Sequence, residues 1–479
     1  MDNKNDVNKK LLIGSGVISI IYFIANILIS GYHEAWRDEG QAWTIAKNLS
    51  LPEIYDLMST EGHFIPWFFI LKCWYRLGGT FSSISVLSAA IMTIAVFIFM
   101  YKAPFHPVVK LLIISSSLFI YYNAVISRCY CIIFLTIIFT AAVRKYRAEK
   151  PIPYCIALAL MLQTHVLLFP LAIALLVEHV IECIIAKDKR RIIPLLIPVL
   201  SLVAAFDELH QSEAKPTAIR VTPKSLLDNM KAELMLPNFK TIIEKVYDTG
   251  TVYYVITTLL VVLLAAFLIE GIRTHNKRSL LLIPVILIGV CGYLAIVTLV
   301  RDCYHIHLAL VFYYIILFSI WISKDESDKE KRTKWNYIVS TVILTVICVI
   351  SYKYVIQDIR SDVTGRFSNS LAIAQDIRDN LPEGSIVIVH SQPVIASAYS
   401  YASEFRPDIT FWNIDRNEEF TCLVWGDDLP YGDINELSAF PENTYFLTNN
   451  LGDDYVFELV AEEAEDNTWV ECYRLYRAK

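Results

Sequence analysis

Charged residues are scarce in this sequence. Asp, Glu, Lys and Arg make up 19% of its 479 residues, against about 25% in an average soluble domain, and hydrophobic residues make up 55%. This balance indicates a membrane protein. With only 16 glycines and 18 prolines, a collagen-like or low-complexity chain is excluded, and the 13% aromatic content excludes a disordered one.

Several motifs that define common sites are missing. The sequence has no P-loop and no GxGxxG stretch, which argues against an ATP-driven pump or a nucleotide-binding enzyme. It has no CxxC or HExxH spacing of the kind that binds zinc, and we expect no nucleic-acid partner. Seven of the ten cysteines lie in or at apolar runs, where cysteine acts as a small hydrophobe. Cys422 and Cys472 could form a disulfide, which sequence alone leaves open.

Eleven apolar runs are long enough, or nearly so, to cross about 30 Å of hydrocarbon as helices. They cover residues 11–30, 81–101, 108–126, 129–143, 152–164, 167–186, 192–206, 251–272, 280–300, 304–323 and 335–356. A further run, 64–77, has only 14 residues and contains Lys72 and Arg76. The sequence therefore predicts an α-helical polytopic membrane protein with about 11 transmembrane helices.

The basic clusters decide how many runs cross the membrane. They occur at residues 9–10, 144–147, 187–191, 273–278 and 329–334. With eleven crossings and a cytoplasmic N-terminus, every cluster lies in the cytoplasm, as the positive-inside rule requires. If residues 64–77 also crossed the membrane, every basic cluster except the one at residues 9–10 would lie outside the cytoplasm. We therefore expect 64–77 to lie along the outer leaflet of a multi-pass cell-membrane protein of bacterial type.

The net charge of −6 conceals a division of the chain. Residues 357–479 contain 23 acidic and 8 basic side chains, whereas residues 1–356 contain 25 acidic and 34 basic ones. We expect 1–356 to form the transmembrane module, with an outer loop at 31–80, and 357–479 to form a small extracytoplasmic α/β domain. Within this domain we predict a helix at 370–380 and strands at 385–390, 409–414, 444–447, 455–459 and 469–476.

A polar motif follows the first predicted span. Asp38 and Glu39 are adjacent carboxylates between Trp36 and Trp43. A carboxylate partly desolvated at a bilayer surface has a raised proton affinity, which suits it to accept a proton from an attacking hydroxyl. In the alternative interpretation, the two tryptophans form an interfacial belt and the carboxylates cap the following helix.

Two further segments fall on the same predicted side. Glu61-Gly-His-Phe-Ile-Pro-Trp67 introduces the short outer helix, and Val125-Ile-Ser-Arg-Cys-Tyr130 forms a turn between two runs. The order of these motifs resembles the membrane-integral C-class (GT-C) glycosyltransferases related to protein O-mannosyltransferases. In those enzymes an Asp-Glu pair is followed by a His-Pro-Pro-like helix entry and an Arg-x-Tyr turn. Phe64 and Ile65 stand here in place of the first two prolines.

The resemblance implies a glycosyltransferase that takes a sugar from a polyprenyl-phosphate donor at the outer leaflet, with a glycan, lipid or protein as acceptor. Asp38 would be the general base, and a single displacement would invert the anomeric centre. Glu39 would help to position the substrates. The phosphate leaving group needs cations or a metal. The predicted substrate- and phosphate-binding residues are His63, Arg128, Tyr130, His165, Arg301, His305 and His307.

Several of these residues also have structural interpretations. Arg128 at the end of a run could contact lipid headgroups, and His165 could bond a neighbouring helix. His305 and His307 are two residues apart and would not share a helix face, so we do not expect a metal pair there. No cofactor is certain, and a requirement for a divalent metal ion stays open.

Other functions are alternatives to the enzyme. The chain could be a transporter or flippase of lipid-linked saccharides, with Asp38 and Arg128 as gates, or a non-catalytic assembly protein whose outer domain binds partners. Glu178, His179 and Glu182, in the predicted cytoplasmic half of their run, could mark an ion path or pair between helices. We find no repeat of the kind that many secondary transporters contain, which favours the enzyme.

Overall fold

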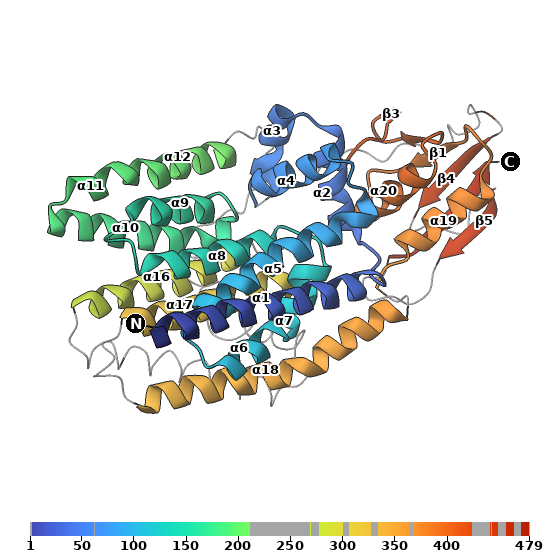
Figure 1. Cartoon of the computed structure of the whole chain (residues 1–479). Coiled ribbons are helices and arrows are strands. Elements are labelled where there is room, and N and C mark those ends of the chain that lie inside the picture. The colour runs from blue at the N-terminus through green and yellow to red at the C-terminus, as the bar shows by residue number, and fades with distance from the viewer. Residues whose placement is uncertain are drawn as a thin grey trace.

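The structure is a computed structural model, and it describes residues 2–61, 63–210, 269, 277–299, 306–326, 334–364, 367–423, 441, 443–448, 457–463 and 471–478. Long helices form a bundle at one end of the molecule, and a sheet with two helices forms the other end (Figure 1). The N-terminus lies at the end of the bundle far from the sheet. The C-terminal strands are therefore separated from the start of the chain by the length of the bundle.

The bundle confirms the prediction of an α-helical polytopic membrane protein. Its longer helices are α1 (Asp2–Ser30), α5 (Ile84–Lys102), α8 (Tyr130–Arg144), α9 (Pro151–Leu162), α10 (Phe169–Ala186), α12 (Leu196–His210), α16 (Lys277–Leu299), α17 (Ile306–Glu326) and α18 (Lys334–Val363). Four described stretches are long and apolar enough to cross a membrane: Asp6–Ser30, Phe81–Lys102, Val166–Ala186 and Lys189–Leu209. Shorter apolar helices are Tyr130–Arg144, Pro151–Leu162 and Leu282–Tyr293. The predicted run 251–272 lies outside the described residues, apart from residue 269.

Helix α1 shows why this bundle belongs in lipid. Its outward side is apolar, with Ile20 61% and Leu28 66% exposed, whereas Ser19 and Asn26 are buried. The nitrogen of the buried amide is bonded within the helix, since Asn26 Nδ2 donates to the carbonyl of Tyr22 at 2.8 Å. In water this arrangement would expose apolar side chains and bury polar ones, which is unfavourable. Hydrocarbon, by contrast, solvates an apolar surface and requires polar groups to be hydrogen-bonded within the protein.

One predicted crossing is not a continuous helix. Residues 108–126 are divided among α6 (Pro107–Ile114), α7 (Ser117–Ile120) and a π-helical turn, η2 (Tyr121–Val125), so the prediction of a single spanning helix there is wrong. The hydroxyls of Ser115 and Ser116 each donate to a backbone carbonyl three or four residues earlier, at 2.7 Å. Such bonds compete with the helical ladder and explain the break.

Ion pairs join two helices at the end of the bundle away from the sheet. Arg144 Nη2 lies 2.6 Å from Glu178 Oε1, and Arg147 contacts both oxygens of Glu182 at 2.7 and 2.8 Å. These pairs connect α8 to α10, so the interpretation of Glu178 and Glu182 as partners in interhelical pairing is confirmed. Buried carboxylates need such partners because an unpaired charge in a low dielectric is costly.

Three shorter helices gather at the opposite end of the bundle, next to the sheet (Figure 1). They are α2 (Arg37–Asn48), α3 (Leu51–Glu61) and α4 (Pro66–Arg76). Helix α4 coincides with the predicted outer helix at 64–77, and Pro66 at its first position suits a helix start because proline has no N–H to satisfy. That α4 lies along the leaflet, and that this end faces away from the cytoplasm, stay predictions.

The C-terminal part is a six-stranded mixed sheet of order β3-β2-β1-β4-β6-β5. Its strands are β1 (Ile386–Val389), β2 (Thr410–Asn413), β3 (Glu418–Glu419), β4 (Thr444–Thr448), β5 (Phe457–Glu463) and β6 (Tyr473–Ala478). β1 pairs parallel with β2 and β4, β4 pairs antiparallel with β6, and α19 (Ser370–Asn380) packs on α20 (Ile395–Phe405). The predicted helix and all five predicted strands are present; the two-residue β3 was not predicted. Cys422 and Cys472 are free thiols.

The two parts of the molecule meet along the segment that leads into α2. The backbone N–H of Ala35 donates to the Tyr401 hydroxyl at 3.0 Å, and its carbonyl accepts from Ser370 Oγ at 2.6 Å. The N–H of Arg37 donates to Glu471 Oε1 at 3.2 Å. The C-terminal domain thus supplies the hydrogen bonds of a loop that has no regular structure of its own.

Helices α2 and α20 approach each other at Gly40. A Cβ atom at this position would lie 2.4 Å from the backbone nitrogen of Ser397 and 2.5 Å from the carbonyl carbon of Ala396. Backbone atoms inside a helix cannot move aside as a flexible side chain does. Glycine is therefore required here by close packing.

We expect Gly40→Ala to destabilise the protein by about 1–3 kcal/mol, the usual cost of overpacking, although alanine is the better helix former. Gly16→Ala in α1 is the matched control, because nothing lies within 4 Å of the added atom; we expect no loss of stability there. Thermal unfolding of the purified variants measures both. Equal stability of Gly40→Ala and the parent would contradict the close contact.

Candidate functional site

Asp38 and Arg128 form an ion pair at the end of the bundle next to the C-terminal domain. Arg128 Nη1 donates to Asp38 Oδ2, and Arg37 Nε lies 3.7 Å from Asp38 Oδ1. The side chains of Asp38 and Arg128 are 14% and 12% exposed, so the pair is largely desolvated but still reachable. A first-turn residue of α2 thus meets the turn before α8, 90 residues later.

Glu39 holds these two segments in place. Its Oε2 accepts from the N–H of Trp36 at 3.1 Å, and its Oε1 accepts from the N–H of Ser127 at 2.6 Å. The first bond caps the start of α2, where N–H groups have no partner within the helix. The second fastens the residue next to Arg128. Because Glu39 is 1% exposed, its carboxylate serves the protein frame, and the predicted contact with substrate stays a prediction.

His33 connects Glu39 to the end of α18. Its Nε2 lies 3.1 Å from Glu39 Oε2 and its Nδ1 3.2 Å from Asp362 Oδ1. Burial works against the charged ring, but the two flanking carboxylates outweigh it and raise the pKa of His33 from 6.5 to about 10. An imidazolium at neutral pH therefore bridges two buried carboxylates, and each of the three charges has a partner.

A pair of neutral histidines lies beside the ion pair. The backbone of His63 forms an isolated antiparallel bridge with that of His165, and their ring centroids are 6.3 Å apart. Burial lowers the pKa of His63 to about 4 and lowers that of His165 well below its usual value, with the charge of Arg128 adding to the effect. Both rings are therefore neutral at pH 7, with one nitrogen that donates and one that accepts.

Glu61 faces the same histidine. Its Oε2 lies 3.6 Å from His63 Nε2, and its Oε1 accepts from Gln41 Nε2 at 2.8 Å. Burial raises the pKa of Glu61 to about 7, although the amide of Gln41 opposes the shift. The carboxyl therefore exists in both protonation states near neutral pH. Gln41, one helical turn after Asp38, thereby ties α2 to the end of α3.

Tyr130 completes the group. Its ring lies 5.8 Å from the Arg128 guanidinium carbon and 6.3 Å from the His165 ring. A guanidinium over an aromatic face gains a cation–π attraction, and the ring limits its movement. Asp38, Glu39, His63, Arg128, Tyr130 and His165, predicted from separate motifs, are thus brought together.

Three predicted residues are not assigned to this group. Arg301 and His305 lie outside the described residues, and His307 lies in the first turn of α17, with its side chain outside what the structure describes. The interfacial-belt interpretation of Trp36 and Trp43 is wrong, because both are 1% exposed and packed inside the protein. Within the described ranges, no group of three or more His, Cys, Asp or Glu side chains could hold a metal ion.

Sequence reasoning missed the residues that support the site. His33 adjoins the Asp-Glu motif, and its position there was the one available signal. Asp362 is 329 residues away from His33, and Ser127 contributes a backbone N–H, so neither has a local signature. Supporting contacts of this kind come from tertiary packing, which a single sequence does not display.

The helical bundle, its juxtamembrane helices and its C-terminal α/β domain form the GT-C fold. The likeness that shows this is to ArnT from Cupriavidus metallidurans bound to undecaprenyl phosphate, over 97% of this chain and 97% of that chain, with a TM-score of 0.52 and 10% sequence identity. The resemblance predicted from the motifs is thereby confirmed for the fold. No protein-family model matches the chain, and no curated protein sequence does.

The charged His33 gives the fold a pH dependence. A group whose pKa is raised on folding stabilises the folded state fully below its unfolded pKa, here 6.5, and this contribution is lost as the pH rises towards about 10. We expect His33→Gln to lower the unfolding temperature most at pH 6, and the difference from the parent to shrink towards pH 10.

Thermal unfolding followed by tryptophan fluorescence across this pH range measures the effect. His106→Gln is the control, since His106 is exposed at the start of α6 and its effect should not follow this trend. A His33→Gln difference that is as large at pH 10 as at pH 6 would contradict the bridging imidazolium.

Proposed function

We propose that this protein is a glycosyltransferase that moves a sugar from a polyprenyl-phosphate donor to an acceptor hydroxyl at the outer leaflet. The observation that carries the proposal is the Asp38–Arg128 pair, in which a carboxylate and a guanidinium lie side by side in a largely desolvated site. A displacement at an anomeric carbon needs these two groups, one to accept the acceptor's proton and one to stabilise the departing phosphate.

Asp38 is the general base in this mechanism. It accepts the proton of the acceptor hydroxyl while that oxygen attacks the anomeric carbon from the face opposite the phosphate. One bond forms between the acceptor oxygen and the sugar, and the bond between the sugar and the phosphate oxygen breaks. A single displacement of this kind inverts the anomeric centre. The position of Asp38 in the first turn of α2 supports this role, because the rigid helix start fixes its carboxylate.

Arg128 serves the leaving group. Before the donor binds, its charge is balanced by Asp38. A donor phosphate offers the guanidinium a stronger, bidentate partner, so binding of the donor would draw Arg128 from Asp38 and leave the carboxylate free to take a proton. The exchange would couple the arrival of the donor to activation of the base. Tyr130, with its ring 5.8 Å from the guanidinium carbon, would support Arg128 in both positions.

The neutral histidines suit the sugar. His63 and His165 offer hydrogen-bond donors and acceptors without a competing charge, because their pKa values are lowered by burial. Sugar hydroxyls are recognised by such groups, whereas a second fixed cation would hold the phosphate in place after transfer. We assign His63 to orientation of donor or acceptor, as the resemblance implies, and we extend the same role to His165, which was predicted to bind substrate or phosphate.

A lipid-linked donor suits a protein that lies in the bilayer. A polyprenyl chain is soluble in the bilayer, and the structurally similar ArnT is bound to undecaprenyl phosphate. A lipid-linked donor reaches the site from the membrane and requires no nucleotide pocket. This agrees with the lack of a P-loop and of GxGxxG in the sequence.

We expect Asp38→Asn to reduce sugar transfer by about 10²–10⁴-fold, the usual contribution of a general base, while the protein still folds. The assay supplies purified protein in detergent with undecaprenyl-phosphate-linked hexoses and a membrane extract as the source of acceptor. Asp56→Asn is the matched control, since Asp56 is exposed on neighbouring α3. Full activity of Asp38→Asn would refute the assigned base. A transporter, by contrast, would form no product in detergent, where there are no leaflets to cross.

Arg128→Gln should lower kcat by about 10²–10³-fold, as removal of one transition-state donor does elsewhere, and should weaken donor binding. The kcat of Arg128→Lys should lie between that of Arg128→Gln and that of the parent, because lysine keeps the positive charge but loses the planar guanidinium group. Arg190→Gln, exposed at the far end of the bundle, controls for loss of a positive charge. If Arg128→Gln changes neither kcat nor KM for the donor, Arg128 does not contact the phosphate.

A further inference from the structure

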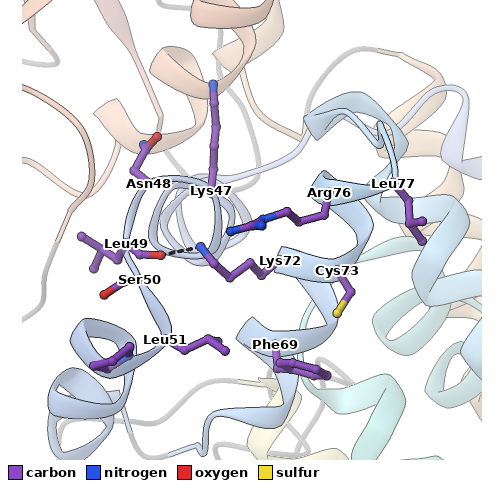
Figure 2. A pocket seen from close by; sticks show the side chains of 11 residues that line it. Lys47, Asn48, Leu49, Ser50, Leu51, Phe69, Lys72, Cys73, Arg76 and Leu77 are labelled. Carbon is purple, nitrogen blue, oxygen red and sulfur yellow. Dashed lines mark hydrogen bonds between the residues drawn. The ribbon is translucent and has the colours of Figure 1, made fainter.

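A groove separate from the candidate site lies beside the C-terminal half of α4. It has a volume of about 910 Å³ and runs between α4 and the segment that links α2 to α3. Figure 2 shows Leu51 and Phe69 facing each other across one part of it and Lys72 and Arg76 pointing towards the end of α2 in another. Asp38 does not line it. The groove is thus apolar at one end and cationic at the other.

The apolar end is open to the surroundings. Phe69 is 48% exposed and Leu51 38%. Large apolar side chains gathered at a surface mark a site of contact with lipid or another molecule. Since the bundle exposes apolar side chains such as Ile20 and Leu28 to lipid, hydrocarbon is a medium that would also solvate Leu51 and Phe69.

Two basic side chains of α4, Lys72 and Arg76, form the cationic end. Lys72 and Arg76 are one turn apart on α4, so their charges share a face and repel. The pKa of Lys72 is lowered by burial and by the neighbouring Arg76. Lys72 Nζ donates to the carbonyls of Ala46 and Leu49, which close the end of α2. Arg76 forms no ion pair with any residue that the structure describes.

The carboxylate of Glu53, whose charge acts on Lys72, is already engaged. Glu53 Oε2 accepts from the N–H of Ser50 at 2.6 Å and so caps the start of α3. It contributes some favourable charge to Lys72, but it is not among the residues that line the groove and forms no ion pair with Lys72 or Arg76 among the described residues. The groove therefore presents donors and positive charge that an external anion can use.

We propose that this groove binds an anionic phospholipid of the surrounding bilayer, with its phosphate at Arg76 and Lys72 and one acyl chain along Leu51 and Phe69. A phosphate beside a guanidinium and an ammonium forms strong charge-assisted bonds, and a membrane chain fills the apolar end. Free phosphate matches only half of this surface. Because Lys72 also closes α2, the bound lipid would fix the depth of α2 relative to the membrane, independently of any sugar transfer.

The test uses the full chain purified in a neutral detergent and needs no activity assay. Phosphatidylglycerol, phosphatidylcholine and inorganic phosphate are added separately, and retained lipid is counted by native mass spectrometry while thermal unfolding is followed. We expect phosphatidylglycerol to be retained and to raise the unfolding temperature, and phosphatidylcholine and inorganic phosphate to have little effect. Equal effects of the two lipids, or a full effect of inorganic phosphate, would overturn the proposal.

Variants locate the site. Arg76→Gln should weaken phosphatidylglycerol retention at least fivefold and leave the unfolding temperature without lipid near that of the parent, because the side chain is exposed. Lys150→Gln, in an exposed loop at the far end of the bundle, is the matched control and should retain the lipid fully. Retention by Arg76→Gln equal to that of Lys150→Gln would place the lipid elsewhere and refute the groove.

Discussion

The carboxylate of Glu39 is the contact on which the candidate site depends. One oxygen caps α2 and the other holds the N–H of Ser127 at 2.6 Å, so a single side chain sets the distance between two segments that the sequence separates by almost ninety residues. The ring of His33 balances the charge of Glu39 and also contacts Asp362 at the end of α18. The Asp38–Arg128 pair then follows from the backbone that Glu39 organises. Buried carboxylates are expensive, and this one is retained with every oxygen bonded.

The C-terminal domain belongs to this frame as much as the bundle does. Tyr401, Ser370 and Glu471 bond the backbone of the loop that precedes α2, and Gly40 allows α20 to pack directly on that helix. The domain therefore supports the segment that carries Asp38. Both hydroxyls and carboxylates of the domain face the bundle: Tyr401 and Ser370 contribute hydroxyls, and Glu471 and Glu404 accept the backbone N–H groups of Arg37 and Phe81.

Most of the fold was readable from the sequence, because lipid imposes strict rules on backbone and charge. Run length and basic clusters predict the long helices of the bundle and the short helix α4, and β-rich apolar runs predict the five longer strands. The prediction of one continuous helix at residues 108–126 fails because hydropathy contains no information on hydrogen bonds such as those from the Ser115 and Ser116 hydroxyls to carbonyls three or four residues earlier. Within the site, side chains with a chemical signature, such as Asp38, His63 and Arg128, were found. His33, Gln41 and the N–H of Ser127 were not, because their roles arise from three-dimensional neighbours.

The π-helical turn at Tyr121–Val125 lies just before the Ser127–Arg128 corner of the candidate site. An extra residue in a helical turn rotates everything that follows, so the turn sets the direction in which the chain leaves α7 and enters the Ser127–Arg128 corner. Deleting or adding one residue upstream would rotate the guanidinium away from α2 while leaving hydropathy unchanged. The register of this one irregular turn thus fixes the direction in which Arg128 points, and with it the contact between Arg128 and Asp38.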